Sequence, residues 1–403
     1  MADRRLRVDL LTREYPPFVY GGAGVHVAEL AKVLREWADV KVAAFDGPRD
    51  EPDVVGYASP PAEAYPNPAL AVFDTDLRMA AGVGGADLIH SHTWYANLAG
   101  HLGGLLHGVP HILSAHSLEP LRPWKAEQLG GGYALSSWAE RTAYEGAAAV
   151  IAVSAGMRAD ILRAYPFVDP DRVRVVHNGI DLDKWRPRRD AAALAQARRL
   201  GIDPEAPSVV FVGRITRQKG LPHFLRAARE LPAETQVVLA AGAPDTPQIA
   251  QEVRDLVAEL AKERSGVVWI EEMLSQGDLD AVLSQASVFV CPSVYEPLGI
   301  VNLEAMACGV AVVGTATGGI PEVVKDGVTG WLVPIEQVAD GTGSPVDPDR
   351  FVSDLAATLN QALEDPDRLA AFGRAARRRV EDHFSWRSIG LETMAVYQEV
   401  LGR

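Results

Sequence analysis

Strand-like and helix-like segments alternate along nearly the whole chain, and the alternation appears twice. Short apolar runs suited to buried strands are separated by stretches with apolar residues at helical spacing, as in residues 25–37. This order predicts parallel sheets with right-handed crossovers, and so two α/β domains with a ligand-binding cleft between them. The expected strands span residues 7–11, 40–45, 87–92, 110–116, 150–154 and 173–177 in the first half, and 208–212, 236–241, 267–270, 288–291 and 311–314 in the second.

The length and the turn-forming residues place a domain boundary near residue 183. A chain of 403 residues suits two domains of ordinary size. Residues 178–189 are rich in turn formers and charge, which predicts a hinge. We therefore expect an N-terminal domain at 1–183 and a C-terminal domain at 184–385. The Pro-rich stretch 52–68 predicts an irregular surface segment, and helical patterns at 350–364, 367–383 and 385–401 end the chain.

The overall charge excludes some classes of partner. The chain has 39 basic and 53 acidic residues, a net charge of −14, so we expect binding neither to nucleic acid nor to anionic membranes. No apolar run reaches membrane-spanning length, and the N-terminus lacks the apolar core of a secretion signal. The only two cysteines, Cys291 and Cys308, lie in apolar runs, which favours buried thiols in a reducing cytoplasm. The oligomeric state is left open, with a homodimer as one arrangement.

Two carboxylates, Glu296 and Glu304, lie eight positions apart around a Pro and a Gly that open a helical pattern. The preceding strand places this turn at the carboxyl edge of a sheet, where open α/β folds bind ligands. A helix beginning near Gly299 would offer unpaired N–H groups to a phosphate, and Glu304 could accept hydrogen bonds from a diol. The alternative is that Glu296 caps the helix and Glu304 is merely solvated.

A second candidate site follows another expected strand. Arg214 and Lys219 lie five positions apart in the loop after residues 208–212. Cations there could stabilise the charge of a leaving diphosphate. The alternative is a solvated basic loop. Most of the Asp-x-Asp pairs lie beside prolines or helix starts, and without a nearby histidine or a shared strand edge we predict no metal site.

The run from Glu296 to Gly309 resembles the E-x7-E signature of retaining glycosyltransferases with two Rossmann-like domains (GT-B fold, family 4). Residues 213–220 are similar to the G-R-x-x-x-x-K-G motif of the same family. The resemblance implies that Glu296 contacts the donor sugar and Glu304 the nucleotide ribose. It also implies that the diphosphate meets Arg214, Lys219 and the backbone of the helix start, namely Gly299, Ile300 and Val301. The last helix, residues 386–403, would cross back to the first domain.

The first half carries further parts of the resemblance. Gly21 and Gly22 follow the first strand in a Gly-Gly loop that the family uses near the donor, and His116 would face the donor sugar and the reacting centre. Taken as a dinucleotide fingerprint the loop fails, because Val27 stands where a third glycine is needed. Glycogen synthases carry Lys and Asp where this chain has Val19 and Thr93, so we expect a different acceptor side.

The resemblance covers almost the whole chain and is strongest to a branch of glycogen synthases of corynebacterial type. It implies a retaining α-1,4-glucosyltransferase that moves glucose from ADP-glucose to glucose 1-phosphate, giving α-maltose 1-phosphate, or to α-1,4-glucan ends. No enzyme nucleophile, metal or other cofactor is implied. We expect Arg122 and Lys125 to be candidates for holding an acceptor phosphate, although both also suit a solvated surface. The alternatives are a UDP- or GDP-sugar transferase with a lipid or small-molecule acceptor, and a non-catalytic sugar-nucleotide-binding protein.

Overall fold

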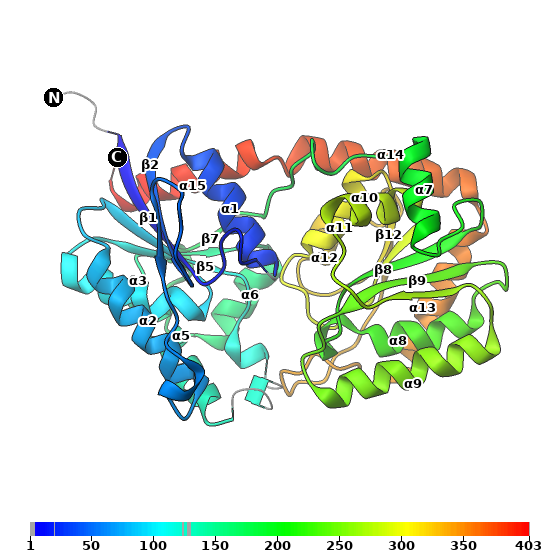
Figure 1. Ribbon diagram of the computed structural model, residues 1–403, viewed down its shortest axis with the longest axis horizontal. Helices are drawn as coiled ribbons and strands as arrows, with labels where there is room; N and C mark the ends of the chain where they lie inside the picture. The colour runs from blue at the N-terminus through cyan, green and yellow to red at the C-terminus, as the bar shows by residue number, and fades with distance from the viewer. Residues whose placement is uncertain (1–4, 20, 123–124, 127–129, 403) are drawn as a thin grey trace. The chain divides into compact units, whose positions relative to one another are not determined.

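The chain divides into two compact units in the computed structural model, which describes residues 5–19, 21–122, 125–126 and 130–402 (Figure 1). Unit 1 comprises Met1–Gly179 with Trp386–Arg403, and unit 2 comprises Ile180–Ser385. The contacts therefore place the boundary between Gly179 and Ile180, four residues before the position expected from the sequence.

Unit 1 is built on a seven-stranded sheet in which every described pairing of named strands is parallel. The strand order is β3-β2-β1-β4-β5-β6-β7. The chain first adds β2 and β3 on one side of β1. Strand β4 then pairs with the other side of β1, and β5, β6 and β7 follow outward from it. The strands are β1 (Leu6–Thr12), β2 (Ala38–Phe45), β3 (Val54–Tyr57), β4 (Leu88–His92), β5 (His111–Ala115), β6 (Ala149–Ala152) and β7 (Val173–Val175).

Helices cover the sheet of unit 1 and include the last helix of the chain. They are α1 (Gly22–Leu34), α2 (Pro68–Gly82), α3 (Trp94–His107), α5 (Gly132–Gly146), α6 (Ala155–Ala164) and α15 (Trp386–Val400), with short 3-10 turns at Ala62–Ala64, Glu119–Leu121 and Pro170–Arg172. Helix α15 packs on α1, where Gly390 faces Val33 and Trp37 so closely that a Cβ would clash (Figure 1). Tyr397 of α15 is fully buried and bonds His90 of β4 at 2.7 Å.

Unit 2 repeats the architecture around a six-stranded parallel sheet with the order β10-β9-β8-β11-β12-β13. Its strands read as nearly continuous apolar runs, as parallel strands buried on both faces do. They are β8 (Ser208–Arg214), β9 (Gln236–Gly242), β10 (Val267–Ile270), β11 (Val288–Cys291), β12 (Ala311–Thr315) and β13 (Gly330–Val333).

The helices of unit 2 bury one apolar face each against the sheet or a neighbouring helix. They are α7 (Ala191–Arg199), α8 (Leu221–Ala227), α9 (Pro247–Glu263), α10 (Gln276–Gln285), α11 (Ile300–Ala307), α12 (Ile320–Val323), α13 (Pro348–Leu363) and α14 (Pro366–His383), with 3-10 turns at Arg217–Lys219 and Ala228–Glu230. Thr246, Ser275, Asp347 and Asp365 cap the starts of α9, α10, α13 and α14 with their side chains.

The expected α/β class with two Rossmann-like domains is confirmed. The prediction for residues 52–68 was wrong in part, because β3 lies there and pairs with β2, with Val54 opposite Val42. A four-residue edge strand among prolines carries too weak an apolar pattern to be recognised locally. The sequence analysis also missed β13, α7 and α12, which are similarly short or polar.

In each unit the strand order reverses once, and this decides where ligands can bind. The reversal lies between β1 and β4 in unit 1, and between β8 and β11 in unit 2. The loops after these neighbouring strands part in opposite directions and leave a crevice at the carboxyl ends. The two candidate sites of the sequence analysis follow these strands.

Candidate active site

The reversal point of unit 2 joins the two motifs of the second half of the chain. Lys219 follows β8 and Glu296 follows β11, and the Lys219 Nζ lies 2.6 Å from the Glu296 Oε2. The Glu296 side chain is only 8% exposed, whereas that of Lys219 is 20% exposed and can meet a ligand. Burial is the largest single influence on the pKa of Lys219 and lowers it, but Glu296 and the other nearby acidic groups together outweigh burial and leave the pKa raised, so Lys219 is cationic at neutral pH.

Ser293 is a further contributor that the sequence analysis did not identify. Its Oγ donates to the Glu296 Oε2 at 3.2 Å, so one carboxylate oxygen is held by both a cation and a hydroxyl. The Glu296 carbonyl accepts from the Gly319 N–H at 2.9 Å, and a Cβ on Gly318 would lie 2.0 Å from the same carbonyl oxygen. Both the side chain and the backbone of Glu296 are therefore held in place. A buried serine three positions before a glutamate is too common to signal this role in the sequence.

The start of α11 leaves backbone N–H groups available at the same edge. Gly299 precedes the helix with φ = +93°, and no side chain caps the helix start. A Cβ on Gly299 would lie 2.5 Å from the Asn302 Nδ2, in a conformation that side chains rarely adopt. Ile300 and Val301 form the first turn, as the resemblance implies. The uncapped N–H groups and the dipole of the helix suit an anion.

Glu304 lies in α11, one turn beyond that start, and is partly buried. Burial raises its pKa to about 7, against the opposing effect of Lys219. Its carboxyl group therefore titrates near neutral pH, which is unusual for a glutamate and typical of functional sites.

Arg214 ends β8 and is exposed, and it forms an ion pair with Asp245. The two predicted cations thus have different partners: Lys219 is held by Glu296 and Arg214 by Asp245. The predicted role of Arg214 in binding diphosphate remains a prediction.

The reversal point of unit 1 carries the Gly-Gly turn. Gly21 precedes α1, which begins at Gly22 and has no side-chain cap. The Gly21 N–H donates to the Glu14 Oε2 at 2.7 Å, and a Cβ on Gly24 would lie 2.7 Å from the Glu14 Cβ. The sequence analysis did not single out Glu14, whose position beneath the turn depends on the tertiary structure.

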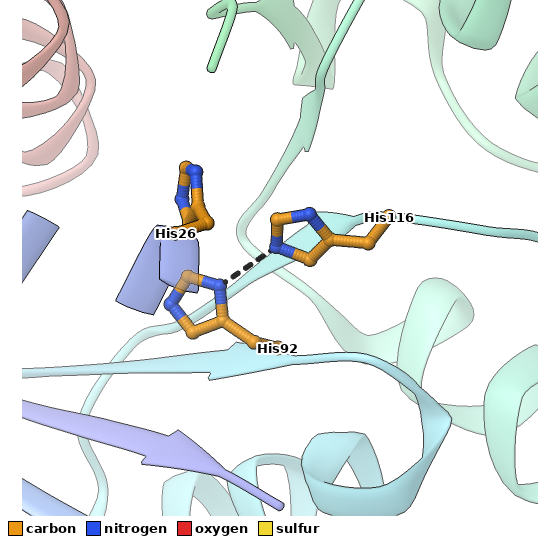
Figure 2. A group of neighbouring side chains, drawn as sticks. All are labelled: His26, His92 and His116. Carbon is orange, nitrogen blue, oxygen red and sulfur yellow. Dashed lines mark hydrogen bonds between the residues drawn. The ribbon is translucent and has the colours of Figure 1, made fainter. Parts of the chain in front are cut away.

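His116 follows β5 directly and belongs to a cluster with His92, the last residue of β4, and His26 of α1 (Figure 2). The His92 Nδ1 lies 3.1 Å from the His116 Nε2. Burial lowers the pKa of His116 to about 4. Burial and the neighbouring rings lower the pKa of His26 and of His92 well below the ordinary value. All three imidazoles are therefore neutral at pH 7.

The two acceptor-phosphate candidates differ in their surroundings. Lys125 is buried, lies 3.7 Å from the Glu119 Oε1 and packs over the rings of Trp94 and Tyr95. Arg122 is partly exposed, and its Nη1 donates to the Ser117 Oγ at 3.2 Å. Lys125 is thus committed to a buried carboxylate, and Arg122 is the better placed of the two to meet a ligand.

The buried carboxylate beside Lys125 belongs to a network. Glu140 accepts from the Glu119 N–H at 2.9 Å and from the Tyr165 hydroxyl at 2.5 Å, and Ser136 donates to Glu119 at 2.6 Å. Burial, together with the charge of Glu119, raises the pKa of Glu140 to about 8. Glu140 is therefore mostly protonated at neutral pH, and Lys125 compensates the charge of the Glu119 carboxylate beside it.

Thr93, the departure from the glycogen synthase pattern, starts α3 with φ = +63° and without a side-chain cap bond. Its buried Oγ1 has no hydrogen-bond partner among the described residues. Among those same residues, no helix is both long enough and apolar enough to cross a membrane.

The chain is similar to known glycosyltransferases along its whole length. Residues 20–184 match the family described as Glycosyltransferase Family 4, and residues 194–379 match Glycosyl transferases group 1. An α-maltose-1-phosphate synthase from Mycolicibacterium smegmatis is 53% identical over 98% of this chain and 100% of its own. A D-inositol 3-phosphate glycosyltransferase from Mycobacterium sp. is 33% identical over 88% of this chain and 85% of its own.

A solved structure supports the same assignment. Sucrose-phosphate synthase from Thermosynechococcus elongatus superimposes with a TM-score of 0.77 at 25% identity, covering 99% of this chain and 100% of that one. The chain therefore belongs to the GT-B glycosyltransferases that combine a Glycosyltransferase Family 4 domain with a group 1 glycosyl transferase domain, and it is a hexosyltransferase.

Proposed function

We propose that this enzyme transfers glucose from ADP-glucose to glucose 1-phosphate with retention of configuration, giving α-maltose 1-phosphate, and also extends α-1,4-glucan ends. The full-length identity of 53% to an α-maltose-1-phosphate synthase supports an α-glucosyltransferase of α-glucan biosynthesis. The observation that carries the proposal is the Lys219–Glu296 pair beside the uncapped start of α11. The pair and the helix start together offer a cation, a carboxylate and free N–H groups, as a sugar diphosphate requires.

Each part of the nucleotide-sugar donor has a counterpart in unit 2. The diphosphate takes the N–H groups at Gly299, Ile300 and Val301, with Lys219 and Arg214 as its cations. Glu296 accepts hydrogen bonds from hydroxyls of the glucose, and Glu304 accepts them from the ribose diol. Gly299 has no side chain to obstruct the diphosphate at this backbone. No other residue fits the position well, because a Cβ there would collide with Asn302.

The reaction exchanges one C–O bond for another on the same face of the sugar. The bond between the anomeric carbon and the β-phosphate oxygen breaks, and the leaving phosphate takes the proton of the acceptor hydroxyl as the new bond forms. Negative charge develops on the diphosphate, so Lys219 stabilises the transition state more than the ground state. His116 serves as a neutral hydrogen-bonding group for the donor sugar, as the family resemblance implies.

A phosphorylated acceptor is supported by two observations. The curated relatives described above are named for small phosphorylated compounds, α-maltose 1-phosphate and D-inositol 3-phosphate. Arg122 is a partly exposed cation six residues after His116, within the same unit. A guanidinium can bind a phosphate through two parallel hydrogen bonds.

The competing proposal is a transferase of the same family that uses a UDP- or GDP-sugar with a lipid or small-molecule acceptor.

We also expect this enzyme to act in a reducing cytoplasm, since Cys291 and Cys308 are free and buried.

One assay tests the proposal. ADP-glucose, UDP-glucose and GDP-glucose are each offered with glucose 1-phosphate, with glycogen and with an unphosphorylated sugar, and the products are resolved by mass spectrometry. We expect ADP release with α-maltose 1-phosphate as the main product. Preference for UDP- or GDP-glucose would favour the competing proposal, and glycogen extension faster than glucose 1-phosphate consumption would identify a polymer elongase.

A further inference from the structure

Three histidines of unit 1 converge although they come from separate segments of the chain (Figure 2). His26 belongs to α1, His92 ends β4 and His116 follows β5. One ring nitrogen from each lies within 4.8 Å of the corresponding nitrogens of the other two. Among the described residues this group contains no acidic side chain, so the donors are three imidazoles.

The separations are close to those of a metal site. Ligand nitrogens about 2.0–2.1 Å from a tetrahedral zinc ion lie roughly 3.3 Å apart. The His92 Nδ1 and His116 Nε2 are already 3.1 Å apart. The His26 nitrogen lies within 4.8 Å of both, so it has to approach them by roughly 1.5 Å at most.

The nitrogens are also available. His26 is only 4% exposed, and neither of its nitrogens has a hydrogen-bond partner in strict geometry among the described residues. The Asn178 side chain interacts with the ring without reaching such geometry. A buried ring nitrogen without a partner costs free energy, and a bound cation would use one nitrogen of His26.

The chemistry of the donors selects the ion. Neutral imidazole is a good ligand for zinc, cobalt and nickel and a poor one for magnesium and calcium. Binding through both the His92 Nδ1 and the His116 Nε2 requires the proton shared between these two atoms to move to the outer nitrogen of its own ring. Three histidines leave a fourth coordination position for water or an anion.

We propose that His26, His92 and His116 bind one zinc-type divalent ion, and that the bound ion inhibits glucosyl transfer reversibly. The inhibition rests on the proposed function, because a metal-bound His116 can no longer donate a hydrogen bond to the donor sugar. The site is thus regulatory: the enzyme needs no metal for transfer, and a chelator preserves or increases its activity.

Binding is measured first, without donor or acceptor. The metal-free full-length protein is titrated with Co²⁺ followed by visible absorbance, and Zn²⁺ is added in competition. We expect one ion per chain, with the visible bands of a four-coordinate histidine site. His26→Gln and His92→Gln should each weaken binding at least about tenfold. The control His383→Gln, which changes an exposed histidine of unit 2, should leave binding unchanged.

Inhibition is measured next. Zn²⁺ should inhibit transfer over the same concentration range in which it displaces Co²⁺, EDTA should restore activity, and Mg²⁺ should have no effect. His26→Gln should shift the inhibition by the same factor as the binding. Thermal unfolding of each variant shows whether it is folded. If one of the two cluster variants does not fold, the other still provides the test.

The outcomes separate the two proposals. No Co²⁺ binding, or binding that both cluster variants retain, overturns the metal site and shows that the rings only fill the interior. Binding without inhibition overturns the regulatory role. Metal binding by a protein that does not use ADP-glucose overturns the proposed function and leaves the site standing.

Discussion

The ammonium group of Lys219 and the carboxylate of Glu296 form an ion pair at 2.6 Å, although 77 positions separate the two residues in the chain. Ser293 binds the same carboxylate oxygen. The cation proposed to stabilise the leaving phosphate is thus held by the carboxylate proposed to bind the sugar.

Removal of this cation should slow the chemical step. We predict that Lys219→Met lowers kcat by roughly 100-fold, since the lost interaction strengthens as charge develops on the leaving group. The control Arg217→Met removes an exposed cation from the same loop and should change kcat by less than about twofold. Steady-state kinetics well below the unfolding temperature provide the measurement. Near-normal turnover by Lys219→Met would exclude the residue from the mechanism.

Donor affinity should depend on pH through Glu304, whose pKa is raised to about 7. Only the carboxylate accepts both hydrogen bonds of the ribose diol, so we predict that the donor KM rises as pH falls from about 8.5 to about 6. Glu304→Gln should have a high KM that no longer changes over this range. A pH dependence of equal size in both proteins would assign it to another group.

The same residue has a calculable effect on stability. Its folded pKa lies above the ordinary value of 4.5, so its contribution to stability is fully present below pH 4.5 and is lost as pH rises through about 7. Glu304→Gln should therefore gain stability relative to the parent protein as pH rises across this window. Urea unfolding of the two proteins on either side of the window gives the comparison.

The two basic residues after His116 should have different effects. We predict that Arg122→Ala lowers kcat/KM for glucose 1-phosphate relative to glucose at least about tenfold, because the partly exposed Arg122 is the candidate for the acceptor phosphate. Donor hydrolysis should remain largely intact. An unchanged acceptor preference in this variant would remove Arg122 from the acceptor site.

Lys125→Met should instead destabilise unit 1. The change leaves Glu119 buried beside Glu140 without its cation, which costs about 3 kcal/mol of unfolding free energy. Chemical denaturation measures the loss. A Lys125→Met protein of normal stability that loses the acceptor preference would restore the original expectation that this residue binds phosphate.

Asp76 of α2 is fully buried, and its carboxylate oxygens have no hydrogen-bond partner among the described residues. Burial raises its pKa well above 3.8, so its ionisation destabilises the fold increasingly as pH rises above that value. We predict that Asp76→Asn stabilises the protein by about 1–2 kcal/mol at pH 8, and by less at lower pH. The control Asp74→Asn loses its salt bridge to Arg78 and should not stabilise. Denaturant titrations at two pH values test this.

Local patterns determined the elements of the fold and the chemistry of unit 2. Long apolar runs and helical periodicity are properties of neighbouring residues, so the major strands and helices were predictable. The short edge strand β3 and the short β13 were not, because tertiary pairing rather than local preference holds such strands in place. Gly299 was predictable too, since only a glycine readily adopts its backbone conformation at the helix start.

Tertiary structure alone decided which side chains meet. Parallel strands that are distant in sequence end at the same sheet edge, so the strand order brings Lys219 to Glu296 and gathers His26, His92 and His116. Burial likewise decided the state of Lys125, which the sequence offers as a surface cation and the fold places beside Glu119. The sequence specifies the groups and their local conformations, whereas distances, desolvation and pKa values arise only when remote segments pack together.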